Sequence, residues 1–213
     1  MADGDGESEA GDPSLPAGSK NRRGCTSVAV VGGGADGAEE SLILIDCGPT
    51  FYPAALTHFA AQNLRKIDAV LLTHGHADAI LGLDNLRSWT LGGVIQDHVD
   101  VYCSRQCFGT VAAMFPYLVD ATRATGGGGA WAISGFHIID AQKPFEVRLL
   151  SGDSITVTPL PAHHGSMDGA PFECLGFRID SLSYLSDCHA VPSATTQLMA
   201  GSQVIAVDAL NRE

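Results

Sequence analysis

Two histidines and an aspartate stand close together in the run His74-Gly75-His76-Ala77-Asp78. The apolar residues 70–72 just before this run read as a buried strand, which would hold one end of it rigidly. Imidazole nitrogens and a carboxylate presented from one loop are ligands that divalent transition metals favour. The spacing therefore predicts a metal site, and zinc is the ion that this set of side chains fits best.

Two later strand-like segments end in side chains of the same kind. These are His163 and His164 after residues 154–160, and Asp187 and His189 after residues 183–185. Strands of one sheet deliver the loops that follow them to a common edge, so we expect the three loops to converge. Two histidines from one loop and a third from another complete the protein part of a zinc site and leave a position open for water. Zinc lowers the pKa of such a water to roughly 7, which makes hydroxide available at neutral pH.

Each of these residues also has a simpler interpretation. Of His163 and His164, we expect one to be a ligand and the other to pack or to form a hydrogen bond. Asp187 alone could be a turn residue, and only the other two loops make it a candidate ligand. His189 is evenly balanced between a functional and an ordinary surface residue. A cysteine nucleophile is a weaker alternative, because no spacing pairs one of the six cysteines with a particular histidine.

The composition excludes several classes of protein. The chain has 213 residues, 45% of them apolar, and a net charge of −12, which indicates a globular domain rather than a disordered chain. Such an acidic chain is not expected to bind nucleic acid through a general electrostatic attraction. No apolar run approaches the roughly 20 residues that cross a bilayer, and the acidic N-terminus is unlike a transit peptide. We therefore expect a cytoplasmic protein without a membrane partner, in which most of the cysteines are buried free thiols.

The expected elements alternate between strands and helices. Residues 1–20 are predicted to form a disordered acidic tail, and residues 21–213 a single domain. Strands are predicted at 26–31, 41–46, 68–73, 99–103, 136–140, 145–150, 154–160, 172–179, 183–185 and 203–208. Helices are predicted at 52–64, 104–115 and 193–200, the last two capped by Ser104 and Ser193, with a helix or turn at 80–86. The apolar run at 204–207 is typical of a central strand.

Thr73-His74-Gly75-His76-Ala77-Asp78 resembles the signature of the metallo-β-lactamase superfamily. Asp46 resembles the first acidic motif of that superfamily, His164 the histidine of its third motif, and Asp187 its bridging aspartate. Further motifs resemble its phosphodiesterase-type hydrolases, which are related to cyclic-phosphate phosphodiesterases and tRNA 3′-processing endonucleases. These motifs are Ser19-Lys20-Asn21-Arg22-Arg23, Asp46-Cys47-Gly48-Pro49, Gly82-Leu83-Asp84-Asn85-Leu86-Arg87, Phe115-Pro116-Tyr117-Leu118 and Cys174-Leu175-Gly176-Phe177. The resemblance covers about residues 19–212.

The resemblance implies an α+β fold with four layers, the αβ/βα sandwich, and a metal site at an edge between the two sheets. It also implies hydrolysis of a phosphodiester by metal-bound hydroxide. A small phosphodiester is favoured over tRNA, because the chain is acidic and no long inserted arm is evident.

The resemblance also assigns roles to the candidate residues. His74, His76 and His164 would hold a first Zn2+, with Mn2+ or Fe2+ as alternatives. Asp78 and Asp187 would hold a second ion, and Asp78 is also the predicted catalytic residue. Asp46 would orient a ligand without binding the metal. No residue is assigned to substrate binding.

The chain departs from the superfamily pattern at three places. Ala79 stands where the superfamily usually has a histidine directly after Asp78. A final histidine motif after residue 208 and the usual glycine-rich first strand are both missing, so the chain reads as shortened at both ends. We therefore expect an incomplete second site, with one ion or weak activity. One alternative function is that of a non-catalytic, vestigial metal-binding protein. Another is that of an oxidative or thioester-cleaving enzyme, which the presence of iron in the purified protein would favour.

Overall fold

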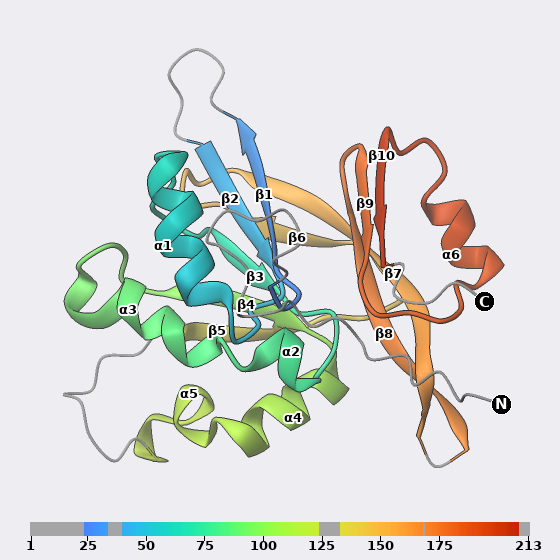
Figure 1. Cartoon of the computed structure of the whole chain (residues 1–213), viewed down its shortest axis with the longest axis horizontal. Coiled ribbons are helices and arrows are strands. Elements are labelled where there is room, and N and C mark those ends of the chain that lie inside the picture. The colour runs from blue at the N-terminus through green and yellow to red at the C-terminus, as the bar shows by residue number, and fades with distance from the viewer. Residues whose placement is uncertain (1–23, 34–39, 124–132, 168, 209–213) are drawn as a thin grey trace, which may run out of the picture.

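The computed structural model describes residues 24–33, 40–123, 133–167 and 169–208 (Figure 1). The predicted acidic tail, the motif at 19–23 and the glycine-rich residues 125–130, for which the sequence predicts a loop, lie outside these ranges. Within them the strands form two sheets of five strands each. The chain completes the first sheet before it enters the second.

The first sheet has the strand order β1-β2-β3-β4-β5. Its strands are β1 (Val28–Gly33), β2 (Glu40–Ile45), β3 (Ala69–Leu71), β4 (Val99–Cys103) and β5 (Ile133–Ile138). Strand β1 is antiparallel to β2, and the other neighbours are parallel. Because β2, β3 and β4 run in one direction, the loops that follow them emerge at the same edge of the sheet.

The second sheet has the order β10-β9-β8-β7-β6. Its strands are β6 (Phe145–Arg148), β7 (Ser154–Met167), β8 (Ala170–Ile179), β9 (Leu182–Leu185) and β10 (Val204–Val207). All neighbours are antiparallel except β9 and β10. The hairpin of β7 and β8 extends well beyond the other strands of this sheet (Figure 1).

The helices lie on the outer faces of the two sheets (Figure 1). The outer face of the first sheet carries α1 (Phe51–Ala61), α2 (Ala77–Ile80), α3 (Arg87–Thr90), α4 (Arg105–Met114) and α5 (Pro116–Val119), with short 3-10 turns at Leu83–Leu86, Leu91–Gly93 and Ala121–Arg123. Helix α6 (Ser193–Leu198) covers the second sheet. The order helix, sheet, sheet, helix is the predicted αβ/βα sandwich.

Three apolar clusters fill the three gaps between the four layers. In β2, Leu42 and Leu44 pack under the helices, whereas Ile43 and Ile45 face the second sheet, as the two-residue period of a strand requires. The cluster between the sheets is completed from the other side by residues such as Phe177. A smaller cluster lies between the second sheet and the segment around α6. The central strands β2, β3 and β4 are therefore largely buried on both faces, which explains their nearly continuous apolar runs.

Two predictions about the second half of the chain are wrong. Ser193 is the first residue of α6, and the capping position belongs to Pro192, which makes no side-chain cap hydrogen bond. The apolar run at 204–207 is an edge strand among the described residues, and Val204 is 57% exposed. Apolar composition alone does not tell whether a strand has one neighbour or two. By contrast, Ser104 caps α4 as predicted, because its Oγ accepts the backbone N–H of Cys107 at 3.1 Å.

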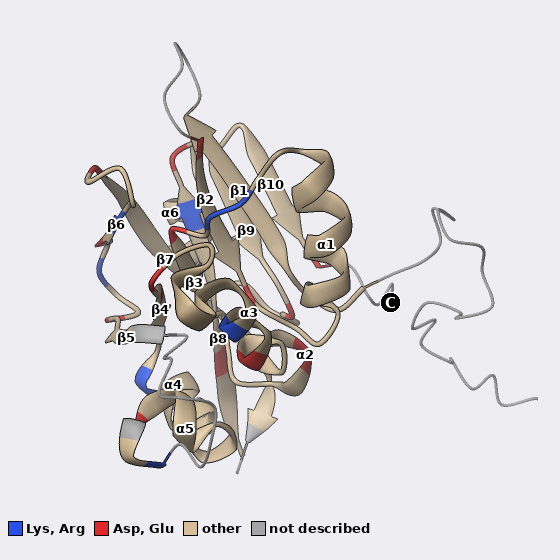
Figure 2. Cartoon of the chain, turned by 90° about the vertical axis from the view of Figure 1, so that its left-hand side faces the viewer, with Lys and Arg blue, Asp and Glu red and all other residues tan. Residues whose placement is uncertain are grey.

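The chemical character of the chain also agrees with its composition. All six cysteines are free, and four of them are buried. Lys and Arg residues lie on separate segments of the described chain in Figure 2, and α1 carries no charged residue. No helix in the described ranges is long and apolar enough to cross a membrane.

Candidate metal centre

The first ligand loop leaves β3 at the edge where the two sheets meet. Thr73 and His74 are both buried there. The carbonyl of Thr73 accepts the backbone N–H of Leu175 in β8 at 2.9 Å, so the loop is tied to the second sheet. His76 follows at the start of α2 and is exposed. The loop therefore places one buried and one exposed imidazole at the junction of the sheets.

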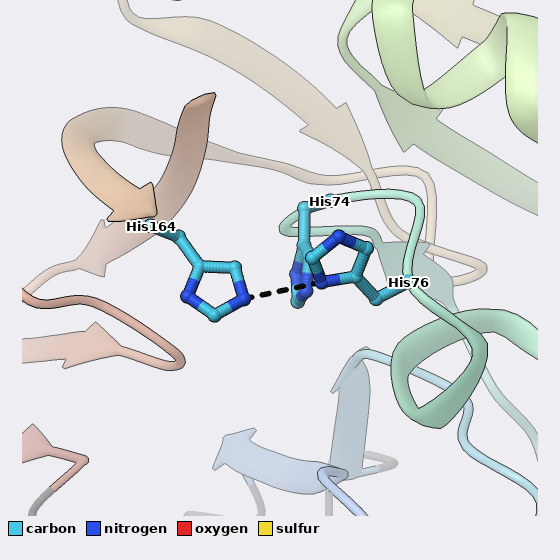
Figure 3. A group of neighbouring side chains, drawn as sticks. All are labelled: His74, His76 and His164. Atoms are coloured by element: carbon cyan, nitrogen blue, oxygen red, sulfur yellow. Dashed lines mark hydrogen bonds between the residues drawn. The ribbon is translucent and has the colours of Figure 1, made fainter. Parts of the chain in front are cut away.

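Three histidines, two from the loop after β3 and one from β7, come together at this junction (Figure 3). One ring nitrogen from each of His74, His76 and His164 lies within 4.8 Å of the other two. The Nε2 atom of His164 is 3.1 Å from Nδ1 of His76, and the ring centroids of His74 and His76 are 4.6 Å apart. The first two of the three predicted ligand segments therefore converge.

Two aspartates adjoin the three histidines. His74, Asp78 and Asp187 form a second group whose ligand atoms also lie within 4.8 Å of one another. The Oδ2 atom of Asp187 is 3.7 Å from Nε2 of His74 and 4.0 Å from Nε2 of His164. The structure thus brings together all five residues that the sequence proposed as ligands, and Asp187 faces both groups.

One structural prediction about these residues is wrong. His163 and His164 do not lie in a loop after a strand, because β7 continues through them to Met167. The pairing of β7 with β8 is irregular between His163 and Ser166, and Gly165 has a φ of 71° in this bulge. A bulge re-aims a side chain without ending a strand. Pro161 and Gly165 are accommodated inside the strand.

Asp46 is linked to His74 through the side chain of Thr73. It is fully buried at the end of β2, and its carboxylate accepts hydrogen bonds from Thr73, from N–H at 2.8 Å and from Oγ1 at 2.9 Å. The same Oγ1 lies 2.8 Å from Nδ1 of His74 and accepts the hydroxyl of Ser186 at 3.1 Å. When Asp46 is charged, the single proton of the Thr73 hydroxyl goes to its carboxylate, so Thr73 accepts from an Nδ1–H of His74. This tautomer leaves the lone pair on Nε2.

The Nε2 atom of His74 supplies the test of whether these residues fit a metal ion. It is buried and has no hydrogen-bond partner among the described residues. An unsatisfied buried polar atom costs about 1–3 kcal/mol. Burial, and then the neighbouring His76 and His164, lower the pKa of His74 to about 4, so the ring is neutral at physiological pH. A neutral imidazole with an unpaired nitrogen facing two imidazoles and two carboxylates fits a zinc-type ion.

The raised pKa values of two carboxylates also fit a metal ion at this position. Burial raises the pKa of Asp46 to about 8, more than the hydrogen bonds from Thr73 lower it. Burial and then the charge of Asp78 also raise the pKa of Asp187. A cation beside these carboxylates would stabilise their charged form.

Asp78 is held in place by the chain around Asp46. A Cβ atom added at Gly48 would collide with the carbonyl oxygen of Asp78, and one at Gly82 would collide with Gly48. Two hydrogen bonds join the same segments, from Cys47 N–H to the Ala79 carbonyl at 2.8 Å and from Gly82 N–H to the Cys47 carbonyl at 2.7 Å. The glycines are therefore needed for close backbone packing beside the ligand loop. Ala79 itself is fully buried in the cluster under the helices.

Two residues of the site were not predicted from the sequence. Phe172 in β8 stacks on His76, with ring centroids 5.0 Å apart and planes 4° apart. Ser186 connects the loop after β9 to Thr73. Its position directly before Asp187 was the only available signal. The contact of Phe172 with His76 could not be predicted, because local sequence does not determine how β8 is placed against the first sheet.

Comparisons with known proteins agree with this geometry. The profile of the β-lactamase superfamily domain matches residues 42–213. A diphosphatase of the PhnP family is 28% identical with a TM-score of 0.65, over 87% of this chain and 60% of that one. Human tRNase Z, short form, is 13% identical with a TM-score of 0.52, over 83% of this chain and 67% of that one.

Among curated proteins, an octanoyltransferase of Porphyromonas gingivalis is 26% identical over 170 residues, which are 79% of this chain and 30% of that protein. The chain thus spans less than two thirds of the diphosphatase and less than one third of the octanoyltransferase. The profile match covers most of the chain, and its strands and layers are those of the metallo-β-lactamase fold. The chain therefore belongs to the β-lactamase superfamily.

Proposed function

We propose that the chain is a metal-dependent hydrolase that cleaves a phosphodiester in a small molecule. The observation that carries the proposal is the buried, unpartnered Nε2 of His74, which faces the other candidate ligands. The relative that is 28% identical is described as a diphosphatase, which supports chemistry at phosphorus. The net charge of −12 favours a small substrate over a nucleic acid.

In this proposal the three histidines hold one Zn2+. A zinc ion at this position lowers the pKa of a water molecule to roughly 7 and so supplies a nucleophile at neutral pH. Asp187 faces the rings of His74 and His164 and would help to hold the ion. Asp78 belongs to the same group as His74 and Asp187 and would orient the attacking water and accept its proton. Asp46 acts through Thr73, which fixes the tautomer of His74.

We propose that only one ion is held tightly. The second group of ligands shares His74 with the first, and its other members are two carboxylates. Ala79, which adjoins Asp78, packs its methyl group in the core and offers no ligand atom. Elemental analysis of the purified protein should therefore find about one zinc per chain. Two tightly held ions would contradict this part of the proposal, and iron in place of zinc would favour an oxidative enzyme.

Hydrolysis of bis(p-nitrophenyl) phosphate by the zinc-loaded protein tests the activity. The wild-type chain should release p-nitrophenol, and the substitution His76→Ala should abolish the release. His58→Ala is the matched control, because His58 is an exposed residue of α1 outside the site. Equal rates for the wild type and His76→Ala would refute the proposal, as would a wild-type rate no higher than that of free zinc.

A phosphate–phosphate bond is the second candidate substrate. It is favoured by the relative described as a diphosphatase, of which this chain covers 60%. The chemistry is related, because attack at phosphorus and departure of an oxygen are common to both bonds. A dinucleoside diphosphate assayed beside bis(p-nitrophenyl) phosphate decides between them by the ratio of the two kcat/KM values.

A further inference from the structure

The segment after β9, residues 186–190, contacts both other ligand-bearing segments. Ser186 donates to Thr73 in the first loop, and His189 contacts β7 on either side of His164. We propose that His189 is a positioning residue, which holds the bulge of β7 so that His164 is aimed at the metal. This inference rests on the proposed function, because it concerns the same metal centre.

His189 holds the bulge of β7 through both its ring and its backbone. Its Nδ1 accepts the backbone N–H of Gly165 at 2.8 Å. Its own N–H donates to the carbonyl of His163 at 2.9 Å, and the N–H of His163 donates to the carbonyl of Ala190 at 2.9 Å. The residues before and after His164 are thus both bound to the segment that carries His189.

The bulge requires such a partner. Strand β8 pairs with β7 up to His163 and again from Ser166, and the regular pairing is interrupted between these two residues. A bulge leaves its extra residue without a ladder hydrogen bond. Gly165 also has a positive φ of 71° and the conformational freedom of a glycine. The ring of His189 supplies the hydrogen bond to Gly165 that the neighbouring strand does not.

The position of His189 separates this role from that of a ligand or a core residue. His189 belongs to neither of the two candidate ligand groups found among the described residues. It is exposed, so its ring contributes little to the core. The contact of its ring with Gly165 therefore acts on the direction of His164 more than on the stability of the fold. In this way one short segment carries the ligand Asp187 and orients the ligand His164.

Zinc titration in competition with a chelating dye tests the role. His189→Ala should weaken zinc binding about tenfold, as is typical when an outer hydrogen-bond partner of a metal site is lost. His189→Asn should restore most of the affinity, because its Oδ1 can take the place of Nδ1. His58→Ala is the control, and the urea midpoint of the metal-free His189→Ala protein should remain that of the wild type.

Hydrogen exchange of the metal-free protein gives a second readout that does not involve zinc. The N–H of Gly165 should exchange about fivefold faster in His189→Ala than in the wild type, which corresponds to the loss of one hydrogen bond. If His189→Ala does not fold, the same two measurements are made on His189→Gln. The side-chain oxygen of glutamine lies one bond further from the backbone than Nδ1 of histidine, so it is out of place for the hydrogen bond to Gly165. Unchanged zinc affinity and unchanged exchange in the variant would overturn the positioning role alone. A wild-type chain that binds no zinc would overturn the proposed function together with it.

Discussion

The two halves of the metal centre are built in different ways. The side chain of His74 is 1% exposed and belongs to a loop anchored between two sheets, whereas that of His164 is 30% exposed and comes from a bulge in a protruding hairpin. The first half is fixed by buried hydrogen bonds through Thr73 and Asp46. The second half is held by a few contacts near the surface. The difference implies that the His74 half is part of the folded core, and that the His164 half can be altered without loss of the fold.

The largest effect on stability and zinc affinity is expected from a substitution in the His74 half of the metal centre. Thr73→Val removes the hydroxyl that donates to Asp46 and accepts from His74 and Ser186. The variant should lose about 1–3 kcal/mol of unfolding free energy, because buried polar groups are left unpaired. Its zinc affinity should also fall about 10–100-fold. Urea unfolding of the metal-free protein and dye competition measure the two losses.

Thr73→Ser is the matched control for this change, because it keeps the hydroxyl. It should retain most of the stability and most of the zinc affinity. If Thr73→Val weakened zinc binding without any loss of stability, the two halves of the site would not differ in the way that their burial suggests.

A pH dependence of intermediate size is expected from the same half. Burial raises the pKa of Asp46 to about 8 from an ordinary value of 3.8, so between these values the folded state holds a proton that the unfolded state releases. The unfolding free energy contributed by this group therefore falls as the pH rises. The pKa of His74 is lowered to about 4 from 6.5, so its contribution rises with pH over that interval. The two slopes oppose each other below pH 6.5, and only that of Asp46 remains above it.

The metal-free protein should therefore lose up to about 2 kcal/mol of unfolding free energy between pH 6.5 and 8. Urea unfolding at pH 6.5, 7.2 and 8 measures this decline. Asp46→Asn cannot ionise and should remove it. A decline of the same size in Asp46→Asn would show that another group is responsible.

The sequence predicted the parts of the site that depend on local spacing. His74, His76 and Asp78 are close in sequence, and a strand directly before them is enough to present them together. The alternation of Leu42 and Ile43 between two cores also follows from the strand period alone.

Contacts between the sheets could not be predicted in this way. Ser186 and Thr73 are 113 residues apart, and their contact depends on how the two sheets pack. The continuation of β7 through His164 was missed for a related reason. A bulge can accommodate residues that normally end a strand, and the partner that makes this possible, β8, comes later in the chain.

The smallest effect is expected at Phe172, on the exposed side of the centre. Its ring stacks on His76 and lies 6.2 Å from the ring of His164, so it limits the movement of both imidazoles. Phe172→Leu removes a stacked pair worth about 0.5–1.5 kcal/mol, and zinc affinity should fall by up to about tenfold. The unfolding free energy should change less than in Thr73→Val, because Phe172 is only half-buried and belongs to none of the three apolar clusters. Phe172→Tyr keeps the stack and should bind zinc like the wild type. A loss of stability in Phe172→Leu as large as that in Thr73→Val would remove the distinction between a core half and a surface half of the metal centre.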